Sequence, residues 1–443
     1  MSEKLRSVGL DVGTTSTQLV VSELTVENRA GSFAVPEMEI AQRSIRYKSP
    51  IYFTPLMGQD RVDGEKIREI VDAEYERAGI SKADVDTGAI IITGETSRKE
   101  NARTVLDALS DYAGEFVVAT AGPDLESVLA AKGAGAADFS EKTGKTVLHM
   151  DIGGGTSNLA LIENGRITAT TCLNVGGRLL KIGADGRIQY VSPVLEGVFH
   201  KRTGDYVDKE EVLELARVLV QALEMAAGLR ERTALLEKLR TAEAGAAWPE
   251  VPPDTVISFS GGVADCIEKE QPWLAFGDMG PELGRAIRES RLCQGEYVLG
   301  QETIRATVIG AGCHSAQLSG STVFAQNVEL PLKNLPVVES AAELAALDGP
   351  GVLALPGIRS PGYDQVAELA RKAVAEFGNR PVLLALQEDM AKALGQQIAL
   401  RLGKDAQILC IDRVKLKAGD YLDVGTPVGP ALPVVIKTLI LSR

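Results

Sequence analysis

The sequence predicts an α/β fold in which two similar halves are followed by a separate C-terminal α/β unit. One observation is an internal repeat: DVGTTSTQL begins at Asp11, and DIGGGTSNL begins at Asp151. Three of the nine aligned positions are identical, four more are conservative, and both copies follow a short apolar strand. The other observation is a regular alternation of strands and helices after Pro331, which is typical of an α/β unit. We therefore expect one half at 1–145, a second half at 146–325 and the C-terminal unit at 326–443.

Length and composition are those of a protein with large buried cores. The chain has 443 residues, of which 45% are hydrophobic and 24% charged, and this size predicts two or three domains. Its net charge of −13 argues against nonspecific binding to nucleic acid or to an anionic membrane surface. The N-terminus lacks the apolar core of a signal peptide, and no stretch approaches the roughly 18 apolar residues of a membrane span. The five scattered cysteines suggest neither a disulfide framework nor a metal motif, so we expect a cytoplasmic protein.

Each copy of the repeat is predicted to form a β-hairpin with an acidic residue at its mouth. The three glycines 153–155 allow backbone N–H groups to point toward a common centre, which suits phosphate oxygens. Asp151 then lies where a divalent cation that bridges those phosphates would be. The first copy offers hydroxyls and amides at residues 14–16 after Asp11. Two similar half-domains that face one ligand are the simplest explanation.

Between the hairpins, the sequence predicts elements that complete the first half. Apolar residues recur at helical spacing over 62–78, where Asp63 could cap the helix. The apolar run 89–92 predicts a strand, and a helix is expected over 98–109. Small residues within 119–137 predict a helix that permits close packing, so we expect it to cross between the halves.

The second hairpin is followed by two further glycine pairs. The segment 174–178, NVGGR, either frames the ligand or simply forms a turn. One long helix or two are expected over 208–240. A strand over 256–259 then leads to Gly261-Gly262 and a helix start, a backbone suited to the close approach of a ligand. A second small-residue segment, 308–314, is expected to pack between the halves.

The C-terminal unit is predicted to contain alternating strands and helices. The expected strands are 352–355, 382–386 and 408–411, the expected helices are 364–377 and 390–402, and the apolar run 434–441 is expected to complete a sheet.

Three segments, in this order, resemble the phosphate-one, phosphate-two and adenosine motifs of the actin, sugar-kinase and heat-shock-chaperone ATPase superfamily. They are DVGTT from Asp11, DIGGGT from Asp151 and FSGGV from Phe259. The small-residue segments look like the two connecting helices of that superfamily, so the resemblance covers roughly residues 5–320. It implies an actin-like ATPase fold with two duplicated ribonuclease-H-like halves.

Nearly the whole chain is similar to a narrower family, the ethanolamine ammonia-lyase reactivating factors of ethanolamine-utilising bacteria. The resemblance lies in TGETSRKENA from Thr93, AGPDLESVLAAKGAGA from Ala121, HMDIGGGTSN from His149 and the tail from Gly419. It implies release of damaged cobalamin from the lyase with ATP and Mg²⁺, so that intact adenosylcobalamin can enter. In that case the cobalamin belongs to the partner enzyme, and the chain acts as a chaperone for it.

The sequence lacks the Asp-x-His-x-x-Gly signature of base-off cobalamin binding. The residues two positions before the three histidines are Val147, Val198 and Gly312. We therefore do not expect cobalamin to bind directly to this chain in that manner.

The ATPase resemblance implies a role for each motif. Asp11 and Asp151 are expected to hold the waters of a magnesium ion, and either could orient the attacking water as a catalytic residue. A third catalytic acid is expected at Glu126, with Glu95 and Asp124 as open alternatives. The residues expected to contact ATP or ADP are Gly13, Thr14, Thr15, Gly153, Gly154, Gly155 and Thr156 at the phosphates and Gly261 and Gly262 at the adenosine.

Two other functions stay open at this stage. A small-molecule kinase of the same fold would consume ATP only with its substrate, and a filament-forming structural protein would polymerise with nucleotide and affect no partner enzyme. The sequence also leaves open a homo-oligomer and residence in a bacterial microcompartment. The unit after Pro331 either contacts the lyase or only covers the ATPase core.

Overall fold

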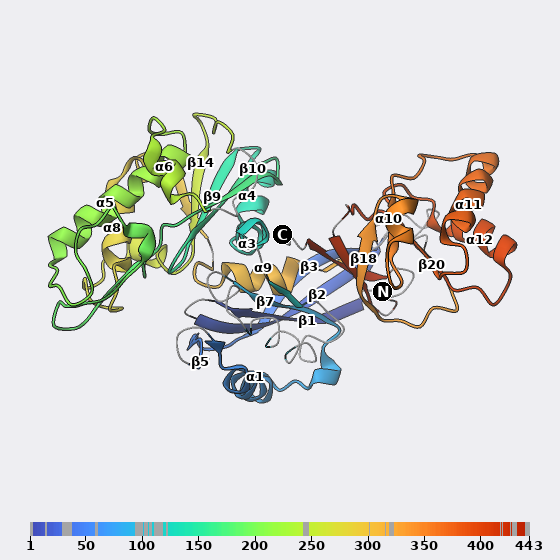
Figure 1. Cartoon of the computed structure of the whole chain (residues 1–443), viewed down its shortest axis with the longest axis horizontal. Coiled ribbons are helices and arrows are strands. Elements are labelled where there is room, and N and C mark those ends of the chain that lie inside the picture. Colours follow the sequence, from blue (N-terminus) through green and yellow to red (C-terminus); the bar gives the residue numbers. More distant parts are fainter. Residues whose placement is uncertain are drawn as a thin grey trace.

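The computed structural model shows a mixed α/β protein with three bodies, each built around its own sheet (Figure 1). The residues that the structure describes are 3–13, 16–28, 38–57, 61–93, 101, 105, 109, 118–120, 123–241, 248–300, 302–314, 316–318, 323–416, 418, 420–425, 427 and 432–438. Most of the helix expected over 98–109 therefore lies outside the described residues. Within the described part of the chain, no helix combines the length and apolar character needed to cross a bilayer.

The first sheet has the strand order β3-β2-β1-β7-β8. Strands β1 to β3 are antiparallel neighbours, whereas β7 runs parallel to β1 and β8 runs parallel to β7. The two-residue strand β4 pairs with the start of β2. The strand bounds are β1 Glu3–Val12, β2 Ser16–Asn28, β3 Met38–Lys48, β4 Tyr52–Phe53, β7 Thr87–Ile92 and β8 Val118–Thr120.

The second sheet repeats this topology with the order β11-β10-β9-β14-β15. Its first three strands are again antiparallel, and β14 and β15 again run parallel to their inner neighbours. The strand bounds are β9 Val147–Ile152, β10 Ser157–Glu163, β11 Arg166–Leu173, β14 Val256–Ser260 and β15 Tyr297–Leu299. This shared topology agrees with the repeat in the sequence, because each hairpin occupies the same place in its own sheet.

Amphipathic helices cover the outer side of each half. Helix α1 (Gly64–Ala78) buries Ile67 and Val71 against the first sheet, and the Asp63 side chain accepts a hydrogen bond from the Lys66 amide at 3.2 Å, as the predicted cap requires. In the second half, the segment 208–240 forms two helices, α5 (Lys209–Ala226) and α6 (Ala234–Leu239). Helix α5 ends two residues before Gly228, whose φ of 72° lies in the left-handed region.

Helices α3 (Pro123–Gly133) and α9 (Ala306–His314) cross between the two sheets (Figure 1). Each helix packs on the sheet of the other half. Helix α3 follows the first sheet in sequence but contacts β9 to β11, and α9 follows the second sheet but contacts β1, β2 and β7. A Cβ atom on Gly133 would lie 1.9 Å from the Ala306 carbonyl oxygen, and one on Gly310 would lie 2.0 Å from the Leu129 carbonyl oxygen. The small residues therefore permit backbone contact between the helices, as the sequence predicted.

We expect Gly310→Ala to destabilise the protein, because the new methyl group would meet backbone that cannot rotate away. The expected loss is about 1–3 kcal/mol of unfolding free energy, the usual cost of overpacking. Urea denaturation of the full chain measures this loss. Gly295→Ala is the matched control, since no atom lies within 4 Å of a Cβ built there. Equal denaturation midpoints for the two variants would contradict the close crossing.

The C-terminal body contains an eight-stranded sheet of order β16-β23-β22-β18-β19-β20-β21-β17. Three predicted strands have the expected bounds, the two predicted helices begin within one residue of expectation, and β23 completes the sheet. The elements are β16 Ala316–Leu318, β17 Phe324–Gln326, β18 Leu332–Val338, α10 Ala341–Ala345, β19 Val352–Leu355, α11 Tyr363–Phe377, β20 Val382–Leu386, α12 Ala391–Leu402, β21 Ile408–Ile411, β22 Asp420–Val424 and β23 Pro433–Thr438.

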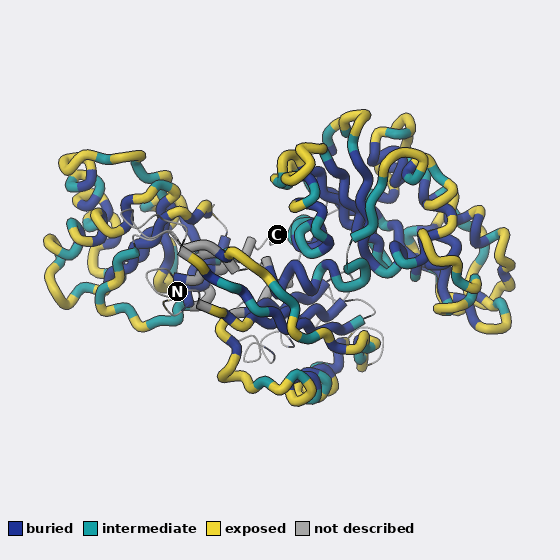
Figure 2. Tube along the Cα trace, turned by 180° about the vertical axis from the view of Figure 1, so that it is seen from behind, coloured by how far each residue is buried: buried dark blue, intermediate teal, exposed yellow. Residues whose placement is uncertain are grey.

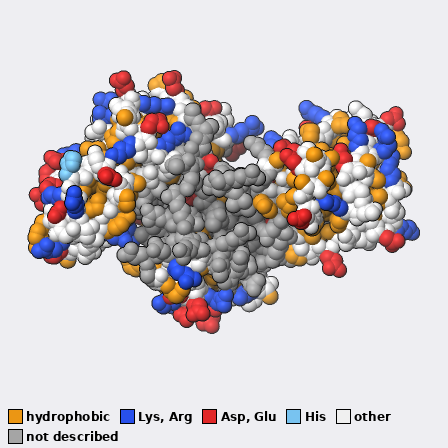
Figure 3. All heavy atoms as spheres, in the orientation of Figure 1, with side chains coloured by type: hydrophobic (Ala, Val, Ile, Leu, Met, Phe, Trp, Pro, Cys, Tyr) orange, Lys and Arg blue, Asp and Glu red, His pale blue; other side chains and the backbone are white. Residues whose placement is uncertain are grey.

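Burial follows these sheets, since their strands are mostly buried whereas the loops and outer helix faces are exposed (Figure 2). On the face shown in Figure 3, basic and acidic side chains are interspersed over the described surface. The exact limits of the three predicted domains stay a prediction. The exchange of α3 and α9 ties the first two halves together across those limits.

Candidate functional site

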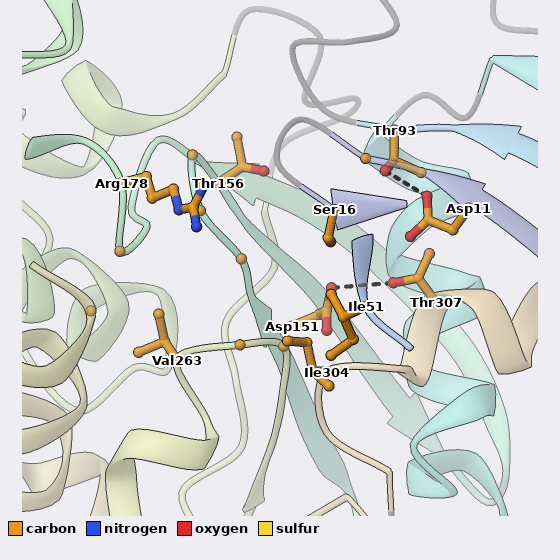
Figure 4. Close-up of a pocket in the computed structure, with 18 of the residues that line it drawn as sticks. Asp11, Ser16, Ile51, Thr93, Asp151, Thr156, Arg178, Val263, Ile304 and Thr307 are labelled. Carbon is orange, nitrogen blue, oxygen red and sulfur yellow. Dashed lines mark hydrogen bonds between the residues drawn. The ribbon is translucent and has the colours of Figure 1, made fainter. Parts of the chain in front are cut away.

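A cavity of about 390 Å³ is lined by residues of both halves. This volume lies within the range of small-molecule sites, about 300–1,000 Å³. The two repeat hairpins line it from different sheets, as Figure 4 shows for Asp11 and Ser16 from the first and Asp151 and Thr156 from the second. Nearly all of the predicted site residues line this cavity: Asp11, Gly13, Glu126, Asp151, Gly153, Gly154, Gly155, Thr156, Gly261 and Gly262. Thr14 and Thr15 lie outside the described residues.

The two hairpin turns are closed by the same backbone hydrogen bond. The Gly13 amide donates to the Ser16 carbonyl oxygen at 2.9 Å, and the Gly153 amide donates to the Thr156 carbonyl oxygen at the same distance. In each hairpin, the aspartate is followed by one more strand residue and then by the turn. The two carboxylates therefore hold equivalent positions. The repeated sequence thus gives both hairpins the same closing hydrogen bond and the same position of the aspartate, on two sides of one cavity.

Asp11 is held at the end of β1 by a neighbouring strand. The Thr93 hydroxyl, directly after β7, donates to its Oδ1 atom at 2.9 Å (Figure 4). The carboxylate is only 8% exposed, and this burial raises its pKa to about 7. The hydrogen bond from Thr93 opposes the rise, and the charge of Asp151 adds to it.

Asp151 is the counterpart of Asp11 in the second half. Its Oδ1 atom accepts a hydrogen bond from the Ser260 hydroxyl at the end of β14, and its Oδ2 atom accepts one from Thr307 of α9 at 3.4 Å. Burial raises its pKa to about 6, against the effect of these two hydrogen bonds. Two desolvated carboxylates that face one cavity favour the binding of a cation between them.

The raised pKa of Asp11 predicts a pH-dependent stability of the nucleotide-free protein. Since the folded state holds this proton more tightly than the unfolded state, the stabilisation is complete below about pH 4 and is lost as pH rises through about 7. Asp11→Asn cannot titrate, so we expect it to gain stability relative to the wild type between pH 4 and 7. The gain is a few kcal/mol at most, since one pKa unit corresponds to about 1.4 kcal/mol. Urea denaturation at several pH values measures it, and a difference that does not change with pH would contradict the prediction.

A buried hydrogen-bonded chain stands behind Asp151. His149 is fully buried on β9, with Nε2 2.9 Å from the Ser260 hydroxyl and Nδ1 3.0 Å from the Ser258 hydroxyl. Because Ser260 donates to Asp151, it accepts from His149, which assigns the ring proton to Nε2. Burial lowers the pKa of His149 to about 3, so the ring stays neutral and keeps the Ser260 proton directed at the carboxylate. No pattern in the sequence indicated this role of His149.

Two side-chain oxygens near the aspartates are buried and have no hydrogen-bond partner within the described part of the chain. They are Gln18 Oε1, across the first hairpin from Asp11, and Asn158 Oδ1, across the second hairpin from Asp151. Both residues line the cavity, where an ion, a water or a ligand could satisfy these atoms. The repeat had aligned Gln18 with Asn158, but it assigned them no role.

The oxygen-rich lining fits a hydrated magnesium ion. Carboxylate and amide oxygens are hard ligands, and Mg²⁺ usually keeps several waters while it contacts one or two carboxylates and the phosphates of a substrate. The described residues contain no cluster of three or more His, Cys, Asp or Glu side chains arranged to hold a metal. Asp11 and Asp151 would hold such an ion jointly with a nucleotide.

Two glycine-rich loops complete the cavity beside the second hairpin. Gly261 has a φ of 87°, and a Cβ atom on it would lie 2.3 Å from the Ile152 carbonyl oxygen. A Cβ on Gly176 would lie 2.4 Å from the Gly154 carbonyl oxygen. Gly177 and Arg178 line the cavity, so the segment left open in the sequence as frame or turn lies at the site.

The structure separates the three candidates for a further acid. Glu126 in the first turn of α3 is buried, lines the cavity and accepts a hydrogen bond from the Asn158 amide at 3.1 Å. Asp124 instead accepts a hydrogen bond from the Thr170 hydroxyl and does not line the cavity. Glu95 lies outside the described residues. Of the two described candidates, only Glu126 is placed to act in the cavity.

Comparison with known proteins assigns the chain to a family. The family model for the ethanolamine utilisation protein EutA matches residues 3–350 and 343–442. The chain is 40% identical over 465 aligned positions to the ethanolamine ammonia-lyase reactivase EutA of Salmonella typhimurium strain LT2, with 99% of each protein covered. It is 38% identical over 464 positions to the reactivase EutA of Escherichia coli strain K12, again with 99% of each covered.

Among solved structures, the chain is similar to the Aquifex aeolicus member of the Ppx/GppA protein family. That likeness has 14% identity and a TM-score of 0.42, and it covers 70% of this chain and 97% of that one. The full-length similarity to curated relatives is the decisive finding. This chain belongs to the EutA family of ethanolamine utilisation proteins.

Proposed function

We propose that this chain is an ATP-dependent reactivase of ethanolamine ammonia-lyase, which releases damaged cobalamin so that intact adenosylcobalamin can bind. The observation that carries the ATPase part is the pair of acidic, glycine-lined hairpins that face one cavity from two sheets of the same topology. Family membership supports the lyase as the partner. The proposed fold is actin-like with two ribonuclease-H-like halves, and the proposed location is the cytoplasm.

The hairpins would bind the phosphates of ATP through backbone amides. Asp11 and Asp151 would hold the Mg²⁺ ion, and the orphaned oxygens of Gln18 and Asn158 would accept hydrogen bonds from its waters. When bound, Mg²⁺ neutralises charge on the phosphates and orients them for attack by water. Glu126, held by Asn158, would then orient the attacking water and accept its proton.

Hydrolysis would weaken the link between the halves. The two hairpins lie on different sheets, so a triphosphate that contacts both holds the cavity closed, and loss of the γ-phosphate removes contacts made across it. The flexing element would be the crossing of α3 and α9, the helices that carry Glu126 and Thr307 into the cavity. Such a cycle can act on a partner only through its different affinities for the two states.

The C-terminal body is the proposed contact with the lyase. Figure 1 shows it on the far side of the first half from the second half, joined by the segment after α9. Its exposed apolar side chains include Tyr363 and Leu400, which are 72% and 77% exposed. Single exposed apolar residues are common, so this assignment rests on position more than on these two side chains.

Reactivation of the lyase tests the proposal directly. Ethanolamine ammonia-lyase inactivated with a cobalamin lacking the adenosyl group is mixed with this protein, Mg·ATP and fresh adenosylcobalamin, and ammonia release is measured. We expect activity to recover with ATP and to stay lost without ATP or in EDTA. Recovery that does not depend on ATP would contradict the ATPase part, and no recovery under any condition would contradict the partner.

Two controls distinguish the alternative functions. ATP consumption that requires a small hydroxylated substrate would indicate a kinase of the same fold. Nucleotide-dependent sedimentation or light scattering, without any effect on the lyase, would indicate a filament-forming protein.

A further inference from the structure

Arg178 is a basic residue that lines the cavity. It is the one Lys, Arg or His among the described residues that line it. Acidic side chains are more numerous there: Asp11, Glu126, Asp151, Asp265 and Asp278. A polyphosphate would enter a strongly negative site, so every cation available to it matters for affinity.

The backbone of Arg178 is fixed to the second hairpin. Its amide donates to the Gly154 carbonyl oxygen at 2.6 Å, and the amide of Gly177 donates to the Gly153 carbonyl oxygen at 3.0 Å. The bare Cα of Gly176 permits this approach, because a Cβ there would collide with the Gly154 backbone. The side chain therefore starts from a point held against the turn that we propose binds phosphate.

Only one of the three guanidinium nitrogens of Arg178 donates a hydrogen bond to a described residue. Its Nε donates to Asp278 Oδ2 at 3.2 Å, whereas no described residue accepts a hydrogen bond from Nη1 or Nη2. The Asp278 carboxylate also accepts a hydrogen bond from the Gly280 amide at 2.9 Å. This bond keeps the carboxylate in place independently of Arg178. Arg178 is 27% exposed, so its free end is accessible from the cavity.

The same guanidinium reaches toward the first half. Its Cζ atom lies 5.6 Å from the centre of the Phe53 ring, within the range of a cation–π contact. Phe53 belongs to β4 and pairs with Ser16, the last residue of the first hairpin turn. Arg178 therefore lies between the second hairpin, which holds its backbone, and Phe53 beside the first, and Figure 4 shows it among the residues that line the cavity.

We propose that Arg178 binds the phosphate chain of the adenine nucleotide and, with Phe53, links phosphate binding to the approach of the two halves. This inference deepens the proposed function and rests on it. A guanidinium presents paired N–H donors that match phosphate oxygens, and its two terminal nitrogens are the ones left without a described partner. Asp278 holds the group in position before the nucleotide arrives, and Phe53 covers its face from the other half.

Calorimetric titration of the full chain with Mg·ATP and with adenosine tests the assignment. We expect Arg178→Ala to weaken ATP binding about tenfold or more, the range of a charge-assisted hydrogen bond, and to leave adenosine binding unchanged. Arg178→Lys should restore only part of the loss, because a point charge lacks the paired donors. Asp278→Asn should weaken ATP binding less than Arg178→Ala does and leave adenosine binding unchanged, because the guanidinium loses its anchor but keeps its charge, and Gly280 keeps an acceptor.

Arg187→Ala is the matched control, since Arg187 also pairs with an aspartate and stacks on an aromatic ring, Tyr206, but lies outside the cavity. We expect it to leave both affinities unchanged. Two results would overturn the assignment: unchanged ATP affinity in Arg178→Ala, or equal losses of ATP and adenosine affinity in both Arg178→Ala and Asp278→Asn, as a purely structural ion pair would give. Wild-type protein that binds no ATP would instead overturn the proposed function itself.

Discussion

Asp151→Asn is expected to slow Mg²⁺-dependent ATP hydrolysis by a factor on the order of 10³ or more. Reactivation of the lyase, which depends on this hydrolysis, should be lost as well. The substitution removes one of the two carboxylates proposed to hold the ion. The amide oxygen of Asn can still accept from Ser260, and the Thr307 hydroxyl can rotate to accept from the amide NH2 group. Folding should be intact, because burial already disfavours the charged form of this group. Phosphate release measured against Mg²⁺ concentration gives the effect.

The control for this variant is Asp185→Asn, which makes the same chemical change on an exposed residue of the second half. It should hydrolyse ATP at the wild-type rate. A wild-type rate of ATP hydrolysis in Asp151→Asn would contradict a catalytic role of the second hairpin. A slower rate in both variants would indicate a nonspecific effect of charge.

Glu126→Gln is expected to slow ATP hydrolysis by about 10²–10⁴-fold, the usual contribution of a general base, while ATP still binds. The amide keeps the size of the side chain but cannot accept a proton from the attacking water. Single-turnover hydrolysis and equilibrium binding of ATP, measured on the same preparation, separate these two effects.

Asp124→Asn serves as the matched control, because Asp124 lies two residues earlier on the same helix and does not line the cavity. We expect normal hydrolysis in that variant. If Asp124→Asn slowed hydrolysis and Glu126→Gln did not, the assignment of the third acid would be wrong.

The hairpins were predictable because their information is local. An apolar strand, an aspartate, a glycine or hydroxyl-rich turn and a second strand determine the geometry within about ten residues, and the repeat doubled the signal. The same holds for the C-terminal body, where β19, β20 and β21 have the bounds that the apolar runs predicted. Short connections and regular alternation leave little freedom in such segments.

The parts that could not be predicted depend on contacts between distant residues. Thr307 reaches Asp151 only because α9 crosses between the sheets, and the Gln18 amide donates to the Ile304 carbonyl oxygen from 286 positions away. The chain gives no local sign of either pairing. Arg178 illustrates the same limit, since its segment was predicted either to frame the ligand or to form a turn, and only the fold places it between the hairpins.

The choice among the acids was also a matter of helix orientation. Asp124 and Glu126 both lie in the first turn of α3, and their sequence positions are equally suited to a helix start. Packing of α3 against the second sheet directs Glu126 to the cavity and Asp124 to Thr170 of β11. A difference of two residues on a helix is a change of face, which the sequence alone did not resolve.

A crystal structure of the full chain with Mg²⁺ and a non-hydrolysable ATP analogue shows whether both hairpins bind one nucleotide. We expect the triphosphate between the turns at 13–16 and 153–156, with the cation beside Asp11 and Asp151. Nucleotide bound elsewhere on the molecule, or a cation held by neither aspartate, would contradict it.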